Sequence, residues 1–186
     1  HFTLESGVSG GIPHAVPDFG TAYNPESMIR PDDMFYFFNG GGLDISFLGF
    51  AEVDKHGNIN VSKFGENFVG CGGFIDIAQN TKKLVFCGTL TTKGLKILKE
   101  NGHLIILSEG KIPKFINQVE QITFNPTIDS VKAQEIIIIT ERCVFKIIKN
   151  GLELIELAPG IDIKNNIASV VGFDFVVSPN LKTMAI

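Results

Sequence analysis

The sequence predicts a domain of the α/β or α+β class, built on a mixed sheet that is partly joined by hairpins and flanked by helices. Short runs of β-branched and aromatic residues, separated by turn signals, recur along the 186 residues. Asn-Gly pairs lie between two sets of these runs, and Asn-Gly is a strong hairpin signal. Helix signals are fewer, so strands make up most of the expected structure.

Three hairpins are predicted, each with a turn that contains Asn and Gly between two apolar runs. Their strands are residues 47–53 with 59–61, 95–98 with 103–107, and 143–148 with 152–157. The helix signals begin at Asn24-Pro25-Glu26, at Gly73 and after Pro159-Gly160. We expect a helix near residue 24, a short helix over 73–79 and a C-terminal helix over 161–171, with Asp162 and Asp129 as candidate caps.

Composition excludes several classes of protein. Hydrophobic residues make up 44% of the chain and charged residues 19%, as in ordinary globular domains. The longest apolar runs, 104–107 and 136–139, are far shorter than the roughly 18 residues of a membrane helix. The 16 basic and 20 acidic residues give a net charge of −4 without a basic cluster. We therefore expect neither membrane nor nucleic acid as a partner.

The three cysteines, Cys71, Cys87 and Cys143, are widely spaced and match no zinc or redox motif. The histidines show no metal-ligand spacing either. These patterns favour a reducing, cytoplasmic location and predict no metal site.

Glycine is concentrated at three places: 7–11, 40–42 and 70–73. Glu5 directly precedes the first cluster, where small residues would let a substrate approach its carboxylate. The third cluster leads into the predicted helix at Gly73, so its backbone N–H groups are free to stabilise a negative oxygen. Each feature alone is also what a solvated turn glutamate or a tight turn would show.

Taken together, Glu5-Ser6-Gly7 and Gly70-Cys71-Gly72-Gly73-Phe74 resemble the Glu-x-Gly and Gly-x-Gly-Gly-Phe motifs of family I coenzyme A transferases. Residues 41–49 and 54–61 resemble the same family in the same order, and the specific resemblance covers about residues 2–90. It is strongest to single-chain acetate and propionate transferases of short-chain acyl groups. The resemblance implies the family I transferase fold, which is shared with isomerases of the ribose-5-phosphate class.

The resemblance also implies the chemistry of the site. Glu5 would be the nucleophile that forms a glutamyl anhydride and then a glutamyl-CoA thioester, with ping-pong kinetics. The loop with Gly70, Gly72 and Gly73 would bind acyl-CoA and stabilise the oxyanions, and Asn60 together with Gly73 would contact coenzyme A. The substrates would be an acyl-CoA and a short-chain carboxylate. No tightly bound cofactor is implied.

Several residues have a second interpretation. Asn60 could cap its own hairpin turn instead of binding coenzyme A. Cys71 could be a thiol nucleophile, but no histidine is placed as its base, and small filler is the better interpretation. Asp44 and Asp76 follow glycine runs and are expected to be structural. We expect the acyl pocket to be lined by Phe19, Phe47 and Phe74.

The resemblance implies that residues 1–186 are the C-terminal, glutamate-bearing domain of a longer transferase, shortened at its N-terminal edge. An N-terminal transferase half is then the expected partner, the domain alone is expected to be inactive, and self-association through the exposed surface is expected. Two alternatives stay open. One is an acyl-CoA hydrolase that uses the same glutamate, and the other is a non-catalytic half that acts only in assembly.

Overall fold

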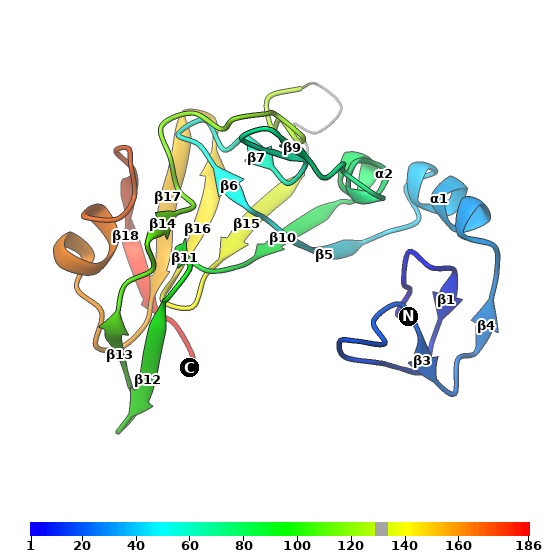
Figure 1. Cartoon of the computed structure of the whole chain (residues 1–186), viewed down its shortest axis with the longest axis horizontal. Helices are drawn as coiled ribbons and strands as arrows, with labels where there is room; N and C mark the ends of the chain where they lie inside the picture. Colours follow the sequence, from blue (N-terminus) through cyan, green and yellow to red (C-terminus); the bar gives the residue numbers. More distant parts are fainter. Residues whose placement is uncertain (129–133) are drawn as a thin grey trace.

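A six-stranded mixed sheet forms the centre of the molecule, in the order β18-β17-β16-β15-β10-β5 (Figure 1). The computed structural model describes residues 1–128 and 134–186. Strands β5, β10 and β15 run parallel, β16 and β17 form an antiparallel hairpin beside them, and β18 runs parallel to β17. The strands are β5 (Ile45–Gly49), β10 (Lys83–Cys87), β15 (Glu135–Ile139), β16 (Cys143–Ile148), β17 (Gly151–Leu157) and β18 (Val176–Thr183). The predicted α/β class with a mixed sheet is confirmed.

Short two-stranded ladders surround this sheet. They are β1 (Val8–Ser9) with β4 (Ser27–Met28), β2 (Ile12–Pro13) with β3 (Ala22–Tyr23), β6 (Glu52–Val53) with β7 (Ile59–Asn60), β8 (Lys63–Phe64) with β9 (Asn67–Phe68), β11 (Thr91–Thr92) with β14 (Ile112–Pro113), and β12 (Lys96–Glu100) with β13 (His103–Ser108). Two predicted hairpins, β12–β13 and β16–β17, are confirmed. The third is confirmed only near its turn, because Phe47 belongs to β5 in the central sheet and the hairpin strand starts at Glu52.

Two α-helices pack on each other beside β5. Helix α1 (Pro31–Asn39) starts with proline and has two aspartates in its first turn, a composition that favours a helix start. The prediction of a helix start near residue 24 is wrong, because residues 24–26 form a bend between β3 and β4, in which Asn24 has a positive φ of 49°. Helix α2 (Phe74–Asn80) confirms the predicted helix, and Met34, Phe38 and Ile77 form a small core with α1.

The C-terminal helix is a single π-helix, η1 (Ile163–Ala168). It is shorter than the predicted 161–171. Asp162 caps it as predicted, since its carboxylate accepts a hydrogen bond from the N–H of Asn165 at 2.7 Å. The other candidate cap, Asp129, lies outside the described residues.

Phenylalanine side chains form much of the main core. The rings of Phe74 and Phe86 stack with centroids 5.8 Å apart, and Phe86 contacts Phe124 at 5.7 Å. Phe50 meets Phe115 edge-to-face at 5.7 Å. Because Phe74 starts α2 and Phe86 lies in β10, their stacking fixes the start of this helix against the central sheet.

A buried arginine connects the sheet to the β12–β13 ribbon. The fully buried side chain of Arg142 donates to both carboxylate oxygens of Glu109, at 2.8 and 3.0 Å, and to Glu141 at 2.6 Å. Partial burial acts to raise the pKa of Glu109, but hydrogen bonds from Arg142 and Thr91 outweigh it and hold that pKa below its ordinary value of 4.5. The Glu109 carboxylate is therefore a stabilising partner of Arg142.

Residues 1–30 form a small lobe of paired short strands, which Figure 1 shows apart from the central sheet and joined to it through α1. Within the described part of the chain, no helix is long and apolar enough to cross a membrane. The candidate site is lined by Glu5 of this lobe, the end of β5 and the start of α2.

Candidate active site

A cavity of about 460 Å³ opens at the carboxyl end of strand β5. In open α/β sheets, ligands bind in crevices outside the carboxyl ends of parallel strands, so this is the position where a substrate site is expected. Its wall combines the end of β5, the start of α2 and the loop before α2 with one residue from the N-terminal lobe. The lining residues are Glu5, Leu48, Gly49, Phe50, Ala51, Val61, Phe64, Gly70, Cys71, Gly72, Gly73 and Phe74.

Glu5 is presented to this cavity by a tight turn. The N–H of Gly7 donates to the carbonyl of Leu4 at 3.0 Å, and the N–H of Leu4 donates to the carbonyl of Val8 at 2.8 Å. Before this turn, the structure has only an isolated bridge between Thr3 and Ser9. Leu4 and Val8 are buried and Glu5 is exposed, so the turn is anchored by apolar side chains while its carboxylate faces out.

Gly7 is required for this turn. Its φ is +98°, a conformation that L-residues with a side chain rarely adopt. A Cβ at this position would also lie 2.0 Å from the carbonyl oxygen of Ile29, in the segment that returns toward α1. The glycine of the Glu-x-Gly motif thus allows two backbone segments to touch directly behind Glu5.

Gly73 brings the two motifs together. A Cβ built on Gly73 would lie 2.9 Å from Oε2 of Glu5 and 2.6 Å from the ring of Phe35. The carboxylate therefore lies against the backbone at Gly73, 68 residues further along the sequence. Glu5, Gly70, Gly72 and Gly73, all predicted from the sequence, line one cavity.

The loop at Gly73 has free hydrogen-bond donors. Among the described residues, the N–H groups of Cys71, Gly72 and Gly73 donate to no backbone or side-chain oxygen, although the N–H of Phe74 donates to Cys71 at 3.1 Å. The Glu5 carboxylate likewise has no hydrogen-bond or ion-pair partner in the same part of the chain. An unpaired carboxylate beside unpaired backbone donors is suited to nucleophilic attack with stabilisation of the resulting oxyanion.

Asn60 does not line the cavity and is completely buried. Its Nδ2 donates to Oε2 of Glu52 and to the carbonyl of Lys63, both at 2.7 Å. Its Oδ1 accepts from the N–H groups of Ser62 at 3.0 Å and Lys63 at 3.2 Å. Asn60 therefore caps its own turn, and its amide has no donor or acceptor left over in this arrangement. Its contact with coenzyme A stays a prediction.

Most of the cavity wall is apolar. Phe74 lines it as expected, but the structure leaves Phe19 and Phe47 exposed and outside the wall. Cys71 lies in the wall as a small residue that also packs against the main core.

Cys143 is buried away from this cavity. Burial raises the pKa of its thiol to about 12, so the thiol is a poor nucleophile.

The two aspartates that follow glycine runs lie outside the cavity. Asp44 pairs with Lys82 at 2.6 Å, and this hydrogen bond lowers the pKa of Asp44. Asp76 accepts a hydrogen bond from Asn39 at 2.8 Å. Within residues 1–128 and 134–186, no group of three or more His, Cys, Asp or Glu side chains could hold a metal ion.

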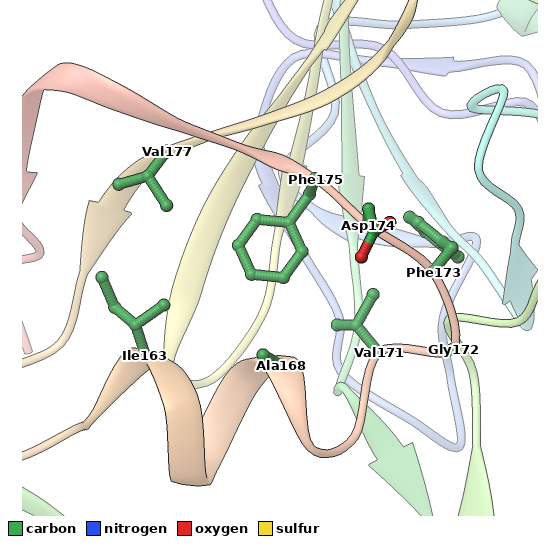
Figure 2. A pocket seen from close by; sticks show the side chains of 8 residues that line it. All are labelled: Ile163, Ala168, Val171, Gly172, Phe173, Asp174, Phe175 and Val177. Atoms are coloured by element: carbon green, nitrogen blue, oxygen red, sulfur yellow. The ribbon is translucent and has the colours of Figure 1, made fainter.

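A second cavity, also of about 460 Å³, lies between η1 and residues 171–177 (Figure 2). The side chains of Ile163, Phe175 and Val177 lie around this space in Figure 2, and Asp174 is the single titratable residue in its wall. Its wall has one glycine, Gly172, whereas Gly49, Gly70, Gly72 and Gly73 surround Glu5 in the wall of the first cavity. The cavity at Glu5 is therefore the better candidate for an active site.

Comparison with known proteins finds relatives along almost the whole chain, although no protein-family model matches it. Acetate CoA-transferase YdiF of Escherichia coli K12 is 44% identical over 182 residues, which cover 98% of this chain and 34% of YdiF. Caffeate CoA-transferase of Acetobacterium woodii is 44% identical over 187 residues, which cover 98% of this chain and 36% of that enzyme.

The fold agrees with these matches. The crystal structure of the YdiF apoenzyme from Escherichia coli O157:H7 aligns with a TM-score of 0.91 at 43% identity, covering 98% of this chain and 34% of that one. The chain belongs to family I of the coenzyme A transferases. It spans about a third of the length of these transferases.

A second structure of YdiF and one separate subunit also match this chain. YdiF has also been solved as a thioester complex with CoA, to which this chain aligns with a TM-score of 0.89, again over 98% of this chain and 34% of that one. One subunit of the succinyl-CoA:3-ketoacid coenzyme A transferase of Helicobacter pylori is 25% identical over 164 residues, which cover 87% of this chain and 68% of that protein. Relatives of this chain thus occur both as parts of long chains and as separate subunits.

Sequence reasoning missed the residues that hold the part of the cavity wall around Phe64. Glu52 pairs with Asn60 across the β6–β7 ladder, and its Oε2 also accepts from the N–H of Glu120 at 3.0 Å. The Glu120 carboxylate in turn accepts from the N–H of Gly65 at 2.6 Å. These bonds hold the loop that contributes Phe64 to the cavity. Glu52 lies in the predicted strand 47–53, but its hydrogen bond to the N–H of Glu120 has no local signal in the sequence.

Lys114 was missed as well. Its Nζ lies 4.0 Å from the centroid of the Phe50 ring, and Phe50 lines the cavity. Burial lowers the pKa of Lys114, although the nearby Glu141 carboxylate opposes this. The ammonium group therefore lies behind one wall of the cavity in a cation–π contact, without lining the cavity itself.

Proposed function

We propose that this chain supplies the nucleophile of a coenzyme A transferase that moves coenzyme A from a short-chain acyl-CoA to a carboxylic acid. The observation that carries the proposal is the contact between Glu5 and the backbone at Gly73, which has unpaired donors beside it. The relatives named acetate and caffeate CoA-transferases support the reaction class.

In the proposed reaction, the Glu5 carboxylate attacks the thioester carbonyl and expels the coenzyme A thiolate, leaving an acyl-glutamyl anhydride. The thiolate then attacks the glutamyl carbonyl and expels the first carboxylic acid as its carboxylate. The product of this half-reaction is a glutamyl-CoA thioester on Glu5. An incoming carboxylate then runs the same two steps in reverse, so the kinetics are ping-pong. A thioester complex with CoA is known for YdiF, in agreement with this scheme.

Each attack passes through a tetrahedral intermediate with a negative oxygen. The N–H groups of Gly72 and Gly73 are the proposed donors to this oxygen, and one such donor contributes about 3 kcal/mol in comparable sites. Gly70 and Gly72 have positive φ values of 80° and 53°, which glycine adopts easily and other residues do not. In this proposal, Gly73 contacts the bound coenzyme, and Asn60 contacts it only after its amide gives up its hydrogen bonds to Glu52 and Lys63.

The rest of the proposed enzyme is a second transferase half. The chain covers about a third of YdiF, and the relative in Helicobacter pylori is named as one subunit of its transferase. We propose that an N-terminal half completes the substrate site beside Glu5, that the chain forms oligomers, and that no resident cofactor is needed. The three free cysteines suit a reducing compartment such as the cytoplasm.

The acceptor requirement tests this function. The chain, combined with the N-terminal half, is incubated with propionyl-CoA with and without acetate, and acetyl-CoA and free coenzyme A are followed by chromatography. A transferase makes acetyl-CoA when acetate is present. When acetate is absent, it does not release free coenzyme A catalytically. Release of free coenzyme A at an equal rate without acetate would instead establish an acyl-CoA hydrolase. Neither product would indicate a half that acts only in assembly.

A further inference from the structure

Among the described residues, one large apolar side chain in the wall of the cavity at Glu5 belongs to neither hydrophobic core. Phe64 lines this cavity and is half-buried, but it is part of neither core cluster and contacts no other aromatic ring. Most other apolar side chains of the wall belong to the main core or pack against it, namely Leu48, Phe50, Val61, Cys71 and Phe74. Core packing therefore does not account for a large aromatic residue at position 64.

Phe64 lies in a hairpin whose two ends both reach the cavity. Strands β8 and β9 form this hairpin. Val61 lines the cavity just before the hairpin, and Gly70 lines it just after. The N–H groups of Val69 and Gly70 both donate to the carbonyl of Ser62, at 3.0 and 3.1 Å, and so close the base of the hairpin. The hairpin therefore forms one side of the cavity, and Phe64 is the side chain that it contributes to the wall.

Hydrogen bonds to a distant segment hold this hairpin in place. At its base, the hydroxyl of the buried Ser62 lies 2.7 Å from the hydroxyl of Thr123. At its turn, the N–H of Gly65 donates to the carboxylate of Glu120 at 2.6 Å. The backbone is thus held on both sides of Phe64, so a smaller side chain at this position enlarges the cavity without releasing the hairpin.

We propose that Phe64 limits the size of the acyl group that this transferase accepts. The inference rests on the proposed function, in which the reacting carbonyl lies at Glu5 and its oxygen at the N–H groups of Gly72 and Gly73. The acyl group then extends along the apolar wall, as apolar parts of ligands do in such cavities. A short aliphatic acyl group fits beside the Phe64 ring, whereas an aromatic acyl group needs the space that the ring occupies.

The rate of covalent labelling at Glu5 tests this inference. The chain, combined with the N-terminal half, is mixed with propionyl-CoA or with benzoyl-CoA. Intact mass follows the formation of the glutamyl-CoA thioester, while propionate or benzoate leaves. Phe64→Ala should raise the ratio of the benzoyl rate to the propionyl rate at least about tenfold, because a change of one methylene in an apolar pocket already alters selectivity about tenfold or more. Comparing the same two thioesters in each variant cancels their different intrinsic reactivity.

Two further variants sharpen the test. Phe64→Leu keeps an apolar side chain with less change in packing, and it should raise the ratio in the same direction by a smaller factor. Phe68→Ala is the matched control, because Phe68 lies in β9 of the same hairpin, is 75% exposed and does not line the cavity. The same truncation at this position should leave the ratio unchanged.

The outcomes separate this inference from the proposed function. Labelling of Glu5 with an unchanged ratio in both Phe64 variants would overturn the inference and leave the transferase chemistry standing. An equal rise of the ratio in Phe68→Ala would overturn it as well, because the effect would then not come from the cavity wall. If the wild-type chain with its N-terminal half is labelled by neither thioester, the proposed function fails and the inference fails with it.

Discussion

Replacing Gly73 by alanine should damage both the packing and the chemistry of the site. The new Cβ would lie 2.6 Å from Cε1 of Phe35 and 2.9 Å from Oε2 of Glu5. Ordinary carbon contacts lie at about 3.5–4.0 Å, so the Phe35 ring or the Gly73 loop must move by about 1 Å. Overpacking of this size costs about 1–3 kcal/mol of folding free energy. A misplacement of about 1 Å in a catalytic group can slow the reaction by about a hundredfold.

Two measurements check this prediction. Urea denaturation gives the change in the free energy of unfolding, and the rate of covalent labelling at Glu5 by acetyl-CoA, in the presence of the N-terminal half, gives the change in reactivity. Gly49→Ala is the matched control for stability, because it adds the same methyl group to the same cavity with nothing within 4 Å and should change stability by less than about 1 kcal/mol. A Gly73→Ala protein that is as stable as wild type and labels Glu5 within threefold of the wild-type rate would refute the reasoning.

Three further results are expected. Asn60→Asp should lose about 2–4 kcal/mol of stability in urea denaturation at neutral pH, because a buried carboxylate would face Glu52. Asn67→Asp, at an exposed position, is the control and should lose little stability. Equal losses in the two variants would contradict the hydrogen bonds assigned to Asn60. The pKa of Glu109 is lowered in the folded state, so its stabilisation is present above pH 4.5 and is lost as the pH falls through the folded pKa. The stability difference between wild type and Glu109→Gln should therefore shrink from pH 7 to pH 3, and a constant difference would exclude this linkage. Cys143 should resist thiol reagents at pH 8 in the folded chain while Cys87 reacts, and rapid modification of Cys143 would contradict its burial.

The sequence was sufficient for the parts of the fold that have local signals. The turns at Asn101-Gly102 and before Gly151 were found because these residues adopt backbone conformations that few others can. Helix α2 was found because it follows a glycine cluster and starts a short apolar helix pattern. The meeting of Glu5 with Gly73 came from motif resemblance alone, since nothing local connects residues 68 positions apart.

The failures have physical causes. Phe47 looked like part of a hairpin strand, but pairing with Val85 in β10 places it in the central sheet, and no local pattern shows that choice. Asn24-Pro25-Glu26 resembles a helix start, yet it forms the bend that leads into the ladder between Ser9 and Ser27. One hydrogen bond of the Asn60 amide is to Glu52, its partner across the β6–β7 ladder. Only the three-dimensional structure therefore reveals that all donors and acceptors of this amide are used.

The most direct test of the proposed chemistry is the intact mass of the chain under denaturing conditions after exposure to acetyl-CoA with the N-terminal half present, followed by peptide mapping. We expect a mass increase equal to coenzyme A bound as a thioester, and peptide mapping should locate it at Glu5. The Glu5→Gln variant should show no such increase. Because the Glu5 side chain is exposed and unpaired among the described residues, this variant should be as stable as the wild type. Coenzyme A bound at another residue, or an adduct that persists in Glu5→Gln, would contradict the assignment of Glu5 as the nucleophile.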